Sequence, residues 1–272
     1  MPKRIALLQM CSGTDPEANA ESVVGAIGAA AMGGASMLFT PEMSALVDRD
    51  RERARGSVVA EDASGFLAKV REAAAGAGIW VTIGSMAVLR EDGRWANRAF
   101  VIDSSGDVVA RYDKIHMFDV DLASGESWRE SSAYAPGEGP VTVETPLGRL
   151  GLTVCYDLRF PALFEAYGRA GCDLIAIPAA FTVPTGQAHW HVMQRARAIE
   201  ATAYVVSAAQ VGLHADGRET YGHSLVVDPW GEVLLDMGGG APGMSFAELD
   251  PARIAAVRAQ VPCLANKRQI AT

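Results

Sequence analysis

The chain alternates between short apolar runs and longer stretches with helical periodicity, separated by glycine, proline or acidic residues. The apolar run at residues 4–9 predicts a buried strand. Asp15 and Pro16 then supply an N-cap and a first helical residue, so we expect a helix over residues 18–32 that ends at a Gly-Gly pair. Residues 36–39 predict a second buried strand.

The same alternation continues to the C-terminal part of the chain. It predicts helices over residues 64–75, 161–169 and 189–201, and strands over residues 79–86, 96–103, 107–112, 149–154, 173–178, 204–210, 222–228 and 232–236. This order is typical of an α/β fold. No repeat or change of composition divides the chain, so we expect one domain over residues 1–272. Residues 113–139 form a long polar connection, and such loops often carry binding or catalytic groups.

The charge balance excludes several classes of partner. The chain has 24 Lys and Arg residues against 32 Asp and Glu residues, a net charge of −8. Nucleic-acid surfaces and polybasic membrane patches need clustered positive charge, so we expect neither partner. No apolar run approaches the ~18 residues of a membrane span, and residues 5–10 are too short for a secretory signal. These features predict a cytoplasmic protein.

The four cysteines stand far apart in the sequence, without a Cys-x-x-Cys pair or a nearby histidine cluster: Cys11, Cys155, Cys172 and Cys263. This disfavours a disulfide framework and a metal site. Cys155 follows a predicted strand and precedes a predicted helix. In open α/β sheets the carboxyl ends of strands face the ligand crevice, where a thiol can act as a nucleophile. The alternative is a small buried hydrophobe.

Two further residues carry groups that complement such a thiol. Glu42 follows the strand at residues 36–39, and its apolar neighbours predict a raised pKa, which suits a general base. The alternative is that Glu42 is an acidic residue in the first turn of a helix, where it interacts favourably with the helix dipole. Lys114 is one of only four lysines, and its compact ammonium group can stabilise an oxyanion. The alternative is a solvated surface lysine.

Taken together, these residues lie in three ordered motifs. The motifs are Phe-Thr-Pro-Glu at residues 39–42, Tyr-Asp-Lys-Ile-His-Met-Phe-Asp at residues 112–119 and Cys-Tyr-Asp-Leu-Arg-Phe-Pro at residues 155–161. They resemble the motifs of the nitrilase superfamily of carbon–nitrogen hydrolases. The resemblance continues through Ala-His-Trp at 188–190, Arg-Ala-Arg-Ala-Ile-Glu at 195–200, Tyr-Gly-His-Ser at 221–224 and Asp-Pro-Trp-Gly at 228–231.

The resemblance implies a four-layer αββα sandwich with a Glu-Lys-Cys triad. By motif, Glu42 is the base, Lys114 the oxyanion stabiliser and Cys155 the nucleophile. A second glutamate of the family lies in the loop before the cysteine. Arg-Glu-Ser-Ser at residues 129–132 resembles its motif better than Gly-Glu-Ser at residues 125–127, so Glu130 is expected to hold Lys114 charged and in position. The backbone N–H of Tyr156 is expected to stabilise the oxyanion as well.

The implied reaction is amide hydrolysis through a thioester on Cys155, which requires neither a metal nor an organic cofactor. Within the superfamily, the segments at residues 179–190, 208–210 and 221–224 resemble the branch of deaminated-glutathione amidases. The alternatives are ω-amidases, which act on 2-oxoglutaramate, and N-carbamoyl amino acid hydrolases. Gln187 and His191 stand where this branch commonly has Pro and Glu, which leaves the substrate open.

Deaminated glutathione and 2-oxoglutaramate are both acidic. We therefore expect a local cation in the pocket despite the net negative charge of the chain. Arg159 and Arg129 are the candidates, and Phe181 and Thr185 are expected to line the pocket. The resemblance also implies a homodimer or higher homo-oligomer that assembles through the helices that contain residues 161–169 and 195–200. A non-catalytic binding protein with the same fold is the alternative from another class.

Overall fold

Two mixed six-stranded sheets form the centre of the computed structural model, which describes residues 1–121, 123, 125 and 127–268. The first sheet has the order β16-β1-β2-β3-β4-β5, with strands Gly243–Leu249, Lys3–Gln9, Met37–Phe39, Trp80–Leu89, Trp95–Ile102 and Val108–Asp113. The second has the order β15-β14-β11-β10-β9-β8, with strands Val233–Asp236, Leu225–Val227, Tyr204–Ser207, Leu174–Ala176, Gly148–Leu152 and Val141–Thr145. The central strands of each sheet are parallel and the outer strands antiparallel.

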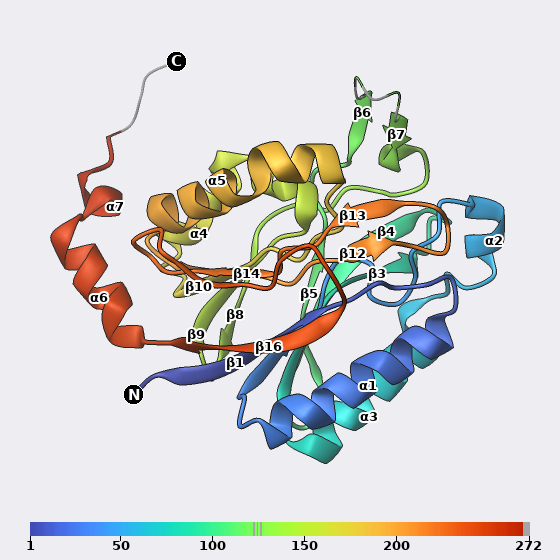
Figure 1. Ribbon diagram of the computed structural model, residues 1–272, viewed down its shortest axis with the longest axis horizontal. Coiled ribbons are helices and arrows are strands. Elements are labelled where there is room, and N and C mark those ends of the chain that lie inside the picture. Colours follow the sequence, from blue (N-terminus) through green and yellow to red (C-terminus); the bar gives the residue numbers. More distant parts are fainter. Residues whose placement is uncertain (122, 124, 126, 269–272) are drawn as a thin grey trace.

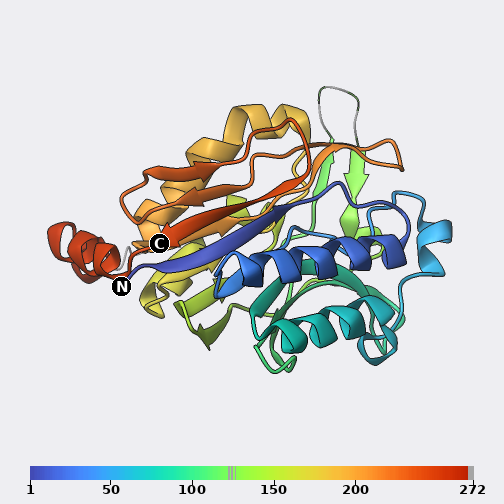
Figure 2. The same ribbon diagram turned by 60° about the horizontal axis from the view of Figure 1, so that its bottom comes forward.

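Helices cover the outer face of each sheet. α1 (Pro16–Met32) and α3 (Gly65–Ala77) lie on the first sheet, and α4 (Pro161–Arg169) and α5 (Val183–Ala201) lie on the second (Figures 1 and 2). The remaining helices are α2 (Arg51–Arg55), α6 (Pro251–Gln260) and α7 (Cys263–Asn266), with 3-10 turns at Glu61–Ala63, Glu130–Ser132 and Cys155–Arg159. The predicted four-layer αββα sandwich is confirmed.

Alternate residues of the central strands enter two different cores. Ile5 and Leu7 of β1 face the second sheet, whereas Ala6 and Leu8 face α1 and α3. Because side chains of a strand alternate between its two faces, a strand buried on both faces reads as a continuous apolar run. This is the pattern that residues 4–9 show in the sequence.

Several elements differ from the sequence predictions. α5 begins at Val183, six residues before the predicted start at His189. The connection over residues 113–139 contains a short antiparallel pair, β6 (Asp119–Asp121) and β7 (Ser127–Arg129), followed by the 3-10 turn at Glu130–Ser132. The pattern also missed β8, β16, α2, α6 and the hairpin of β12 (Val211–Leu213) and β13 (Glu219–Tyr221).

The turns after β2 and β10 approach each other closely where the two sheets meet. Gly84 of β3 lies between them, and a Cβ atom there would stand 2.1 Å from the Thr40 carbonyl oxygen and 2.4 Å from the Pro178 Cβ. Only glycine leaves room for this contact. It brings the segment after β2 beside the segment after β10, and the site described below lies at their junction.

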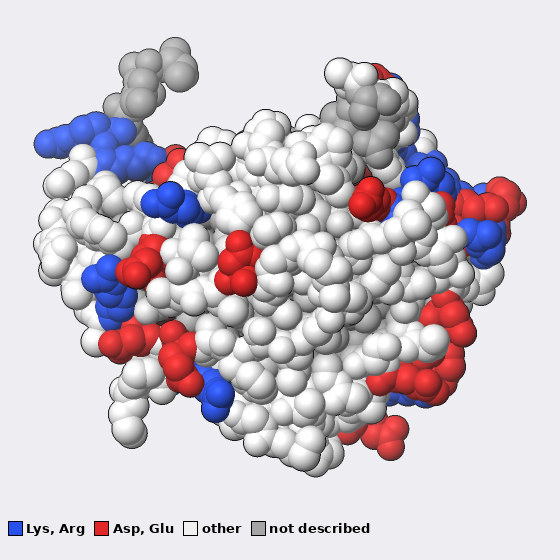
Figure 3. Space-filling view, viewed as in Figure 1, with Lys and Arg blue, Asp and Glu red and all other residues white. Residues whose placement is uncertain are grey.

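The surface shows mixed charges. On the face drawn in Figure 3, the coloured basic side chains stand in small groups close to acidic ones. Within the described residues, no helix is long and apolar enough to cross a membrane.

Candidate active site

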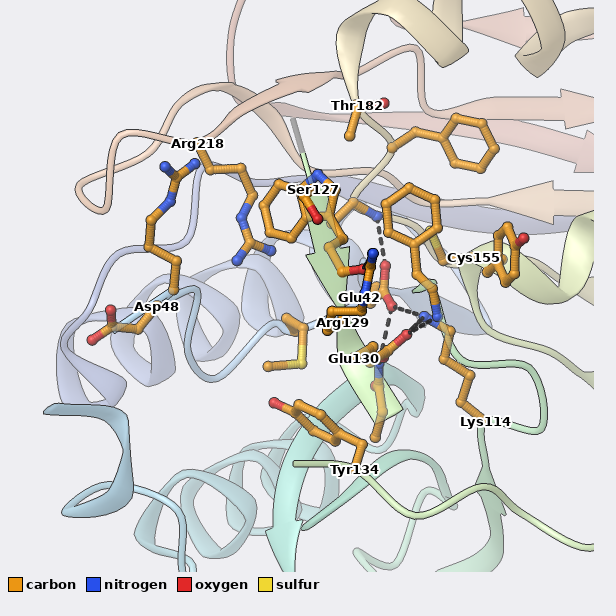
Figure 4. Close-up of a pocket in the computed structure, with 18 of the residues that line it drawn as sticks. Glu42, Asp48, Lys114, Ser127, Arg129, Glu130, Tyr134, Cys155, Thr182 and Arg218 are labelled. Atoms are coloured by element: carbon orange, nitrogen blue, oxygen red, sulfur yellow. Dashed lines mark hydrogen bonds and ion pairs between the residues drawn. The ribbon is translucent and has the colours of Figure 1, made fainter. Parts of the chain in front are cut away.

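A buried lysine between two carboxylates forms the centre of the site. The Lys114 Nζ donates to Glu42 Oε1 at 2.9 Å and to Glu130 Oε2 at 2.9 Å (Figure 4). The Lys114 side chain is only 2% exposed, and those of Glu42 and Glu130 are 6% and 13% exposed. Asn97 Nδ2 donates to both carboxylates, at 3.0 Å each. All four groups therefore hold one another in place.

The three charged members of the cluster lie near the ends of different elements, whereas Asn97 lies within β4. Glu42 follows β2, Lys114 follows β5 directly, and Glu130 begins the 3-10 turn after β7. The Lys114 backbone is fixed by its N–H bond to the Asn97 carbonyl at 2.9 Å. The second Glu42 oxygen accepts the Ala180 N–H at 2.9 Å, and Ala180 follows β10 in the other sheet. Glu42 thus connects the two sheets.

Cys155 faces this cluster from a strained turn. It has φ = +48°, a conformation that non-glycine residues rarely adopt, and its N–H donates to the Pro178 carbonyl at 2.8 Å. Its thiol and the Glu42 carboxylate shift each other's pKa, and both groups line the same cavity wall. The buried Asp157 carboxylate holds the turn, because it accepts Val154 N–H at 2.9 Å and Tyr112 Oη–H at 2.7 Å.

The electrostatics of the cluster differ from the sequence prediction for Glu42. Burial does oppose ionisation of Glu42, but the Lys114 charge and hydrogen bonds from Cys155, Lys114 and Asn97 bring its pKa below the ordinary value. The predicted raised pKa is therefore wrong. Burial likewise opposes the charge of Lys114, but Glu130 and Glu42 raise its pKa well above the ordinary value. Burial and then the Glu42 charge raise the pKa of Cys155 well above its ordinary value. The resting site has a carboxylate, an ammonium group and a neutral thiol.

A cavity of about 750 Å³ opens over the cluster. Glu42, Lys114, Glu130 and Cys155 form part of its wall, and all five other residues singled out in the sequence line it: Tyr156, Phe181, Thr185, Arg159 and Arg129. Among the residues that the structure describes, six cationic side chains line the cavity against three carboxylates, those of Glu42, Asp48 and Glu130. This described lining is therefore positive in a chain of net charge −8.

The two predicted arginines differ in what they contact. The guanidinium group of Arg129 pairs with both oxygens of Asp121, at 2.7 and 2.9 Å, so its charge is largely compensated. Arg159 has no carboxylate within 4.0 Å among the described residues, and it packs over Tyr156 and Phe181 at 5.8 and 5.4 Å from the ring centroids. Glu126, the less favoured candidate for the second glutamate, lies outside the described residues.

One group of metal-ligating side chains lies outside the cavity lining. His191 Nε2 and His223 Nδ1 each contact an oxygen of Asp236 at 2.9 Å, and the three ligand atoms lie within 4.8 Å of one another. The Tyr221 ring stacks on His223 at 4.3 Å between centroids. Each imidazole thus has one ring nitrogen in contact with the same carboxylate.

The comparisons with known proteins agree with this geometry. The family model "Carbon-nitrogen hydrolase" matches residues 4–259. The chain belongs to the carbon–nitrogen hydrolase family. It is therefore an enzyme that hydrolyses carbon–nitrogen bonds, and the reaction class predicted from the sequence is confirmed.

Individual relatives of this carbon–nitrogen hydrolase cover nearly the whole chain. A Yersinia enterocolitica protein named deaminated glutathione amidase is 38% identical over 271 residues, 98% of this chain and 94% of that protein. The crystal structure of the Caenorhabditis elegans NitFhit protein has a TM-score of 0.90 and 35% identity, over 98% of this chain and 65% of that chain. Saccharomyces cerevisiae Nit3, a member of branch 10 of the nitrilase superfamily, has a TM-score of 0.86 and 27% identity, over 96% of this chain and 95% of that one.

Two contributors to the carbon–nitrogen hydrolase site were missed in the sequence. Asn97 is 2% exposed and is the third residue of β4, and an amide within a largely buried strand is a detectable sign of a buried polar contact. Ala180 contributes only its backbone N–H, so its side chain gives no sign of the contact with Glu42.

We expect the variant Lys114→Met to be destabilised in a pH-dependent way. Removing one partner of a buried ion pair typically costs about 3–5 kcal/mol, because the remaining charge stays uncompensated. Without the ammonium, burial raises the folded-state pKa of Glu42 above its unfolded value. The carboxyl group then favours folding only while it is protonated, so this contribution is lost as the pH rises through that raised pKa.

Urea unfolding of the wild type and Lys114→Met at pH 5 and pH 8 measures this effect, and the loss of unfolding free energy should be larger at pH 8. The control is Lys69→Met, which removes an exposed lysine paired with Glu17. An equal loss for Lys114→Met at both pH values would contradict the assigned charges.

Proposed function

We propose that this carbon–nitrogen hydrolase is a cysteine amidase with Cys155 as nucleophile, Glu42 as general base and Lys114 as oxyanion stabiliser. The main support is the contact network in which the ionised Glu42 accepts Lys114 Nζ while the Cys155 thiol lies in the same cavity wall and the two groups shift each other's pKa. A neutral thiol must lose its proton as the sulfur attacks. We assign the Glu42 carboxylate as the acceptor of that proton.

The proposed reaction has two halves. The Cys155 Sγ attacks the amide carbonyl carbon while its proton passes to Glu42, and the tetrahedral oxyanion is stabilised by Lys114 and the Tyr156 N–H. No backbone acceptor for the Tyr156 N–H is found in the described residues. Glu42 then donates its proton to the departing nitrogen, which leaves a thioester. Water, deprotonated by Glu42, hydrolyses the thioester and regenerates the thiol.

Glu130 acts through Lys114 in this proposal. Its two oxygens accept from Lys114 Nζ at 3.1 and 2.9 Å, and Oε2 also accepts the Phe118 N–H at 2.7 Å. The second carboxylate keeps the ammonium charged when Glu42 takes up the thiol proton. Without it, protonation of Glu42 would leave a buried ammonium unpaired.

We propose deaminated glutathione as the substrate, cleaved to 2-oxoglutarate and cysteinylglycine. The name of the Yersinia relative and the positive cavity support a substrate with carboxylates. Arg159, which has no acidic partner among the described residues, is the group that we propose for the carboxylate of the acyl part, with Phe181 and Thr185 beside it. The ω-amide 2-oxoglutaramate and N-carbamoyl amino acids are the competing substrates.

We expect Cys155→Ala to abolish hydrolysis of deaminated glutathione, because the nucleophile is lost. Release of 2-oxoglutarate in a coupled assay measures the rate. Cys11→Ala, which changes an exposed thiol, is the control and should retain the wild-type rate. Hydrolysis by the Cys155→Ala protein would refute the mechanism, and a wild type inactive on all three substrates would favour a non-catalytic binding protein.

The variant Arg159→Gln should raise the KM for deaminated glutathione by roughly tenfold or more, because a charge-assisted contact with the carboxylate is worth about 1.5–3 kcal/mol. Steady-state rates with deaminated glutathione, 2-oxoglutaramate and an N-carbamoyl amino acid give kcat/KM for each. A much higher wild-type kcat/KM for 2-oxoglutaramate would show that the substrate proposal is wrong. An unchanged KM in Arg159→Gln would remove Arg159 from the carboxylate site.

We also propose that residues 1–272 fold as one cytoplasmic domain that forms a homodimer or higher homo-oligomer. Apolar side chains are exposed along α5 and beside it, with Val192 63%, Ile199 47% and Trp230 50% exposed. The four cysteines are free, as is usual in a reducing compartment.

Light scattering should give at least twice the 28.7 kDa mass of the chain. Ile199→Asp should shift the mass toward the monomer, because it places a charge in an apolar contact. The matched control is Leu213→Asp, at an exposed leucine on the β12–β13 hairpin. A monomeric wild type would contradict the proposal.

A further inference from the structure

The cavity has a second cationic region around Trp128. The guanidinium Cζ atoms of Arg218 and Arg49 lie 4.7 and 5.7 Å from the Trp128 ring centroid. All three residues line the same cavity as Cys155. Figure 4 shows Arg218 on the opposite side of the pocket from Cys155. We call Arg49, Trp128 and Arg218 the distal site.

The positive charge of the distal site is only partly compensated. Arg49 has no carboxylate within 4.0 Å among the described residues, and the only one that close to Arg218 is Asp216, at 3.4 Å from its Nη2. Asp48, the other acid at this end of the cavity, is held by Arg53 at 2.6 Å. Within the described part of the chain, the distal site therefore has one guanidinium without a carboxylate partner, that of Arg49, and one paired only at 3.4 Å, that of Arg218.

A row of aromatic rings relates the distal site to the nucleophile. The Trp128 centroid lies 6.3 Å from that of Phe118, which lies 5.1 Å from that of Tyr156. Tyr156 follows Cys155 in the chain, and Arg159 packs over its ring. Two ring contacts, Trp128 to Phe118 and Phe118 to Tyr156, thus lie between the distal site and the region around Arg159. An extended chain of about three peptide units spans roughly 10 Å, which is the same scale.

We propose that Arg49 and Arg218 bind a carboxylate at the far end of the leaving group. This inference rests on the proposed function, since it assumes that Cys155 cleaves an amide in this cavity. It assigns the residues that would recognise the far end of the proposed leaving group: cysteinylglycine ends in a free carboxylate, which Arg49 and Arg218 would bind. A substrate that releases ammonia leaves the distal site unused.

The chemistry of the side chains fits this ligand. A guanidinium group presents N–H donors in a planar fork that matches a carboxylate, and such charge-assisted bonds are about twice as strong as neutral ones. Stacking on Trp128 holds both guanidinium groups before the substrate arrives, which lowers the entropy lost on binding. An indole next to the carboxylate also displaces water and strengthens the interaction.

The test compares two substrates that differ only at the distal carboxylate. They are deaminated glutathione and its C-terminal carboxamide, which keep the same acyl group and the same scissile amide. The ratio of kcat/KM for the acid to kcat/KM for the amide isolates the distal contact. In the wild type we expect this ratio to be roughly tenfold or more, because one charge-assisted hydrogen bond is worth about 1.5–3 kcal/mol.

The double variant Arg49→Gln/Arg218→Gln should bring the ratio close to one, through a rise in KM for the acid. Arg55→Gln is the matched control, since Arg55 lies on the neighbouring α2, is 70% exposed on its side chain and does not line the cavity. Arg55→Gln should keep the wild-type ratio. Circular dichroism and the melting temperature show whether the double variant is folded.

The outcomes separate this inference from the proposed function. A wild-type ratio near one, or a ratio that the double variant retains, overturns the distal site while Cys155-dependent hydrolysis of both substrates still supports the amidase. Equal loss of kcat/KM for both substrates in the double variant also overturns it, because the arginines then act on the cavity as a whole. If neither substrate is hydrolysed in a Cys155-dependent way, the proposed function itself fails.

Discussion

The ion pairs of Lys114 impose the strictest constraint on this structure. An ammonium group that is only 2% exposed is stable only if carboxylates and hydrogen bonds compensate its charge, and here Glu42 and Glu130 do so together. Glu42, which is 72 residues from Lys114 in the sequence, and Glu130, which is 16 residues from it, must therefore meet Lys114 at one point. The sheets, the tight approach at Gly84 and the turn at Cys155 all serve that convergence.

The central strands and most of the site were predictable because their signals are local or lie in motifs. The apolar runs at residues 4–9 and 36–39 predict β1 and β2, and the motif resemblance brings Glu42, Lys114 and Cys155 together. Two edge strands, β8 and β16, gave no such signal: every second residue of β8 is exposed, and β16 begins with Gly-Met-Ser and pairs with β1 from the other end of the chain. Their formation depends on a partner strand, which periodicity does not show.

Two other misses have steric and electrostatic reasons. The first turn of α5 contains Pro184 and Gly186, which weaken the helical pattern, yet a Cβ at Gly186 would stand 2.2 Å from the Tyr221 ring. Packing against Tyr221 therefore requires glycine at this position, although glycine weakens the helical pattern in the sequence. For Glu42, apolar neighbours in sequence suggested a raised pKa, but the residues that set the pKa come from other strands. The residues next to Glu42 in the sequence indicate that it is buried. They do not show the charge from a distant segment whose effect on the pKa outweighs that of burial.

The contact between Glu42 and Ala180 also bears on how the enzyme reaches its active form. This hydrogen bond joins residues 138 positions apart, and the bond of Glu42 to Lys114 joins residues 72 apart. Local helices form on much shorter timescales than such nonlocal contacts, whose loop closure must come first. A chain with its helices formed but its sheets not yet docked lacks the contacts that hold Glu42 beside Cys155 and Lys114. The proposed catalytic arrangement therefore requires both sheets to be in place, and a partly folded chain exposes Cys155 without the burial that raises its pKa in the folded protein.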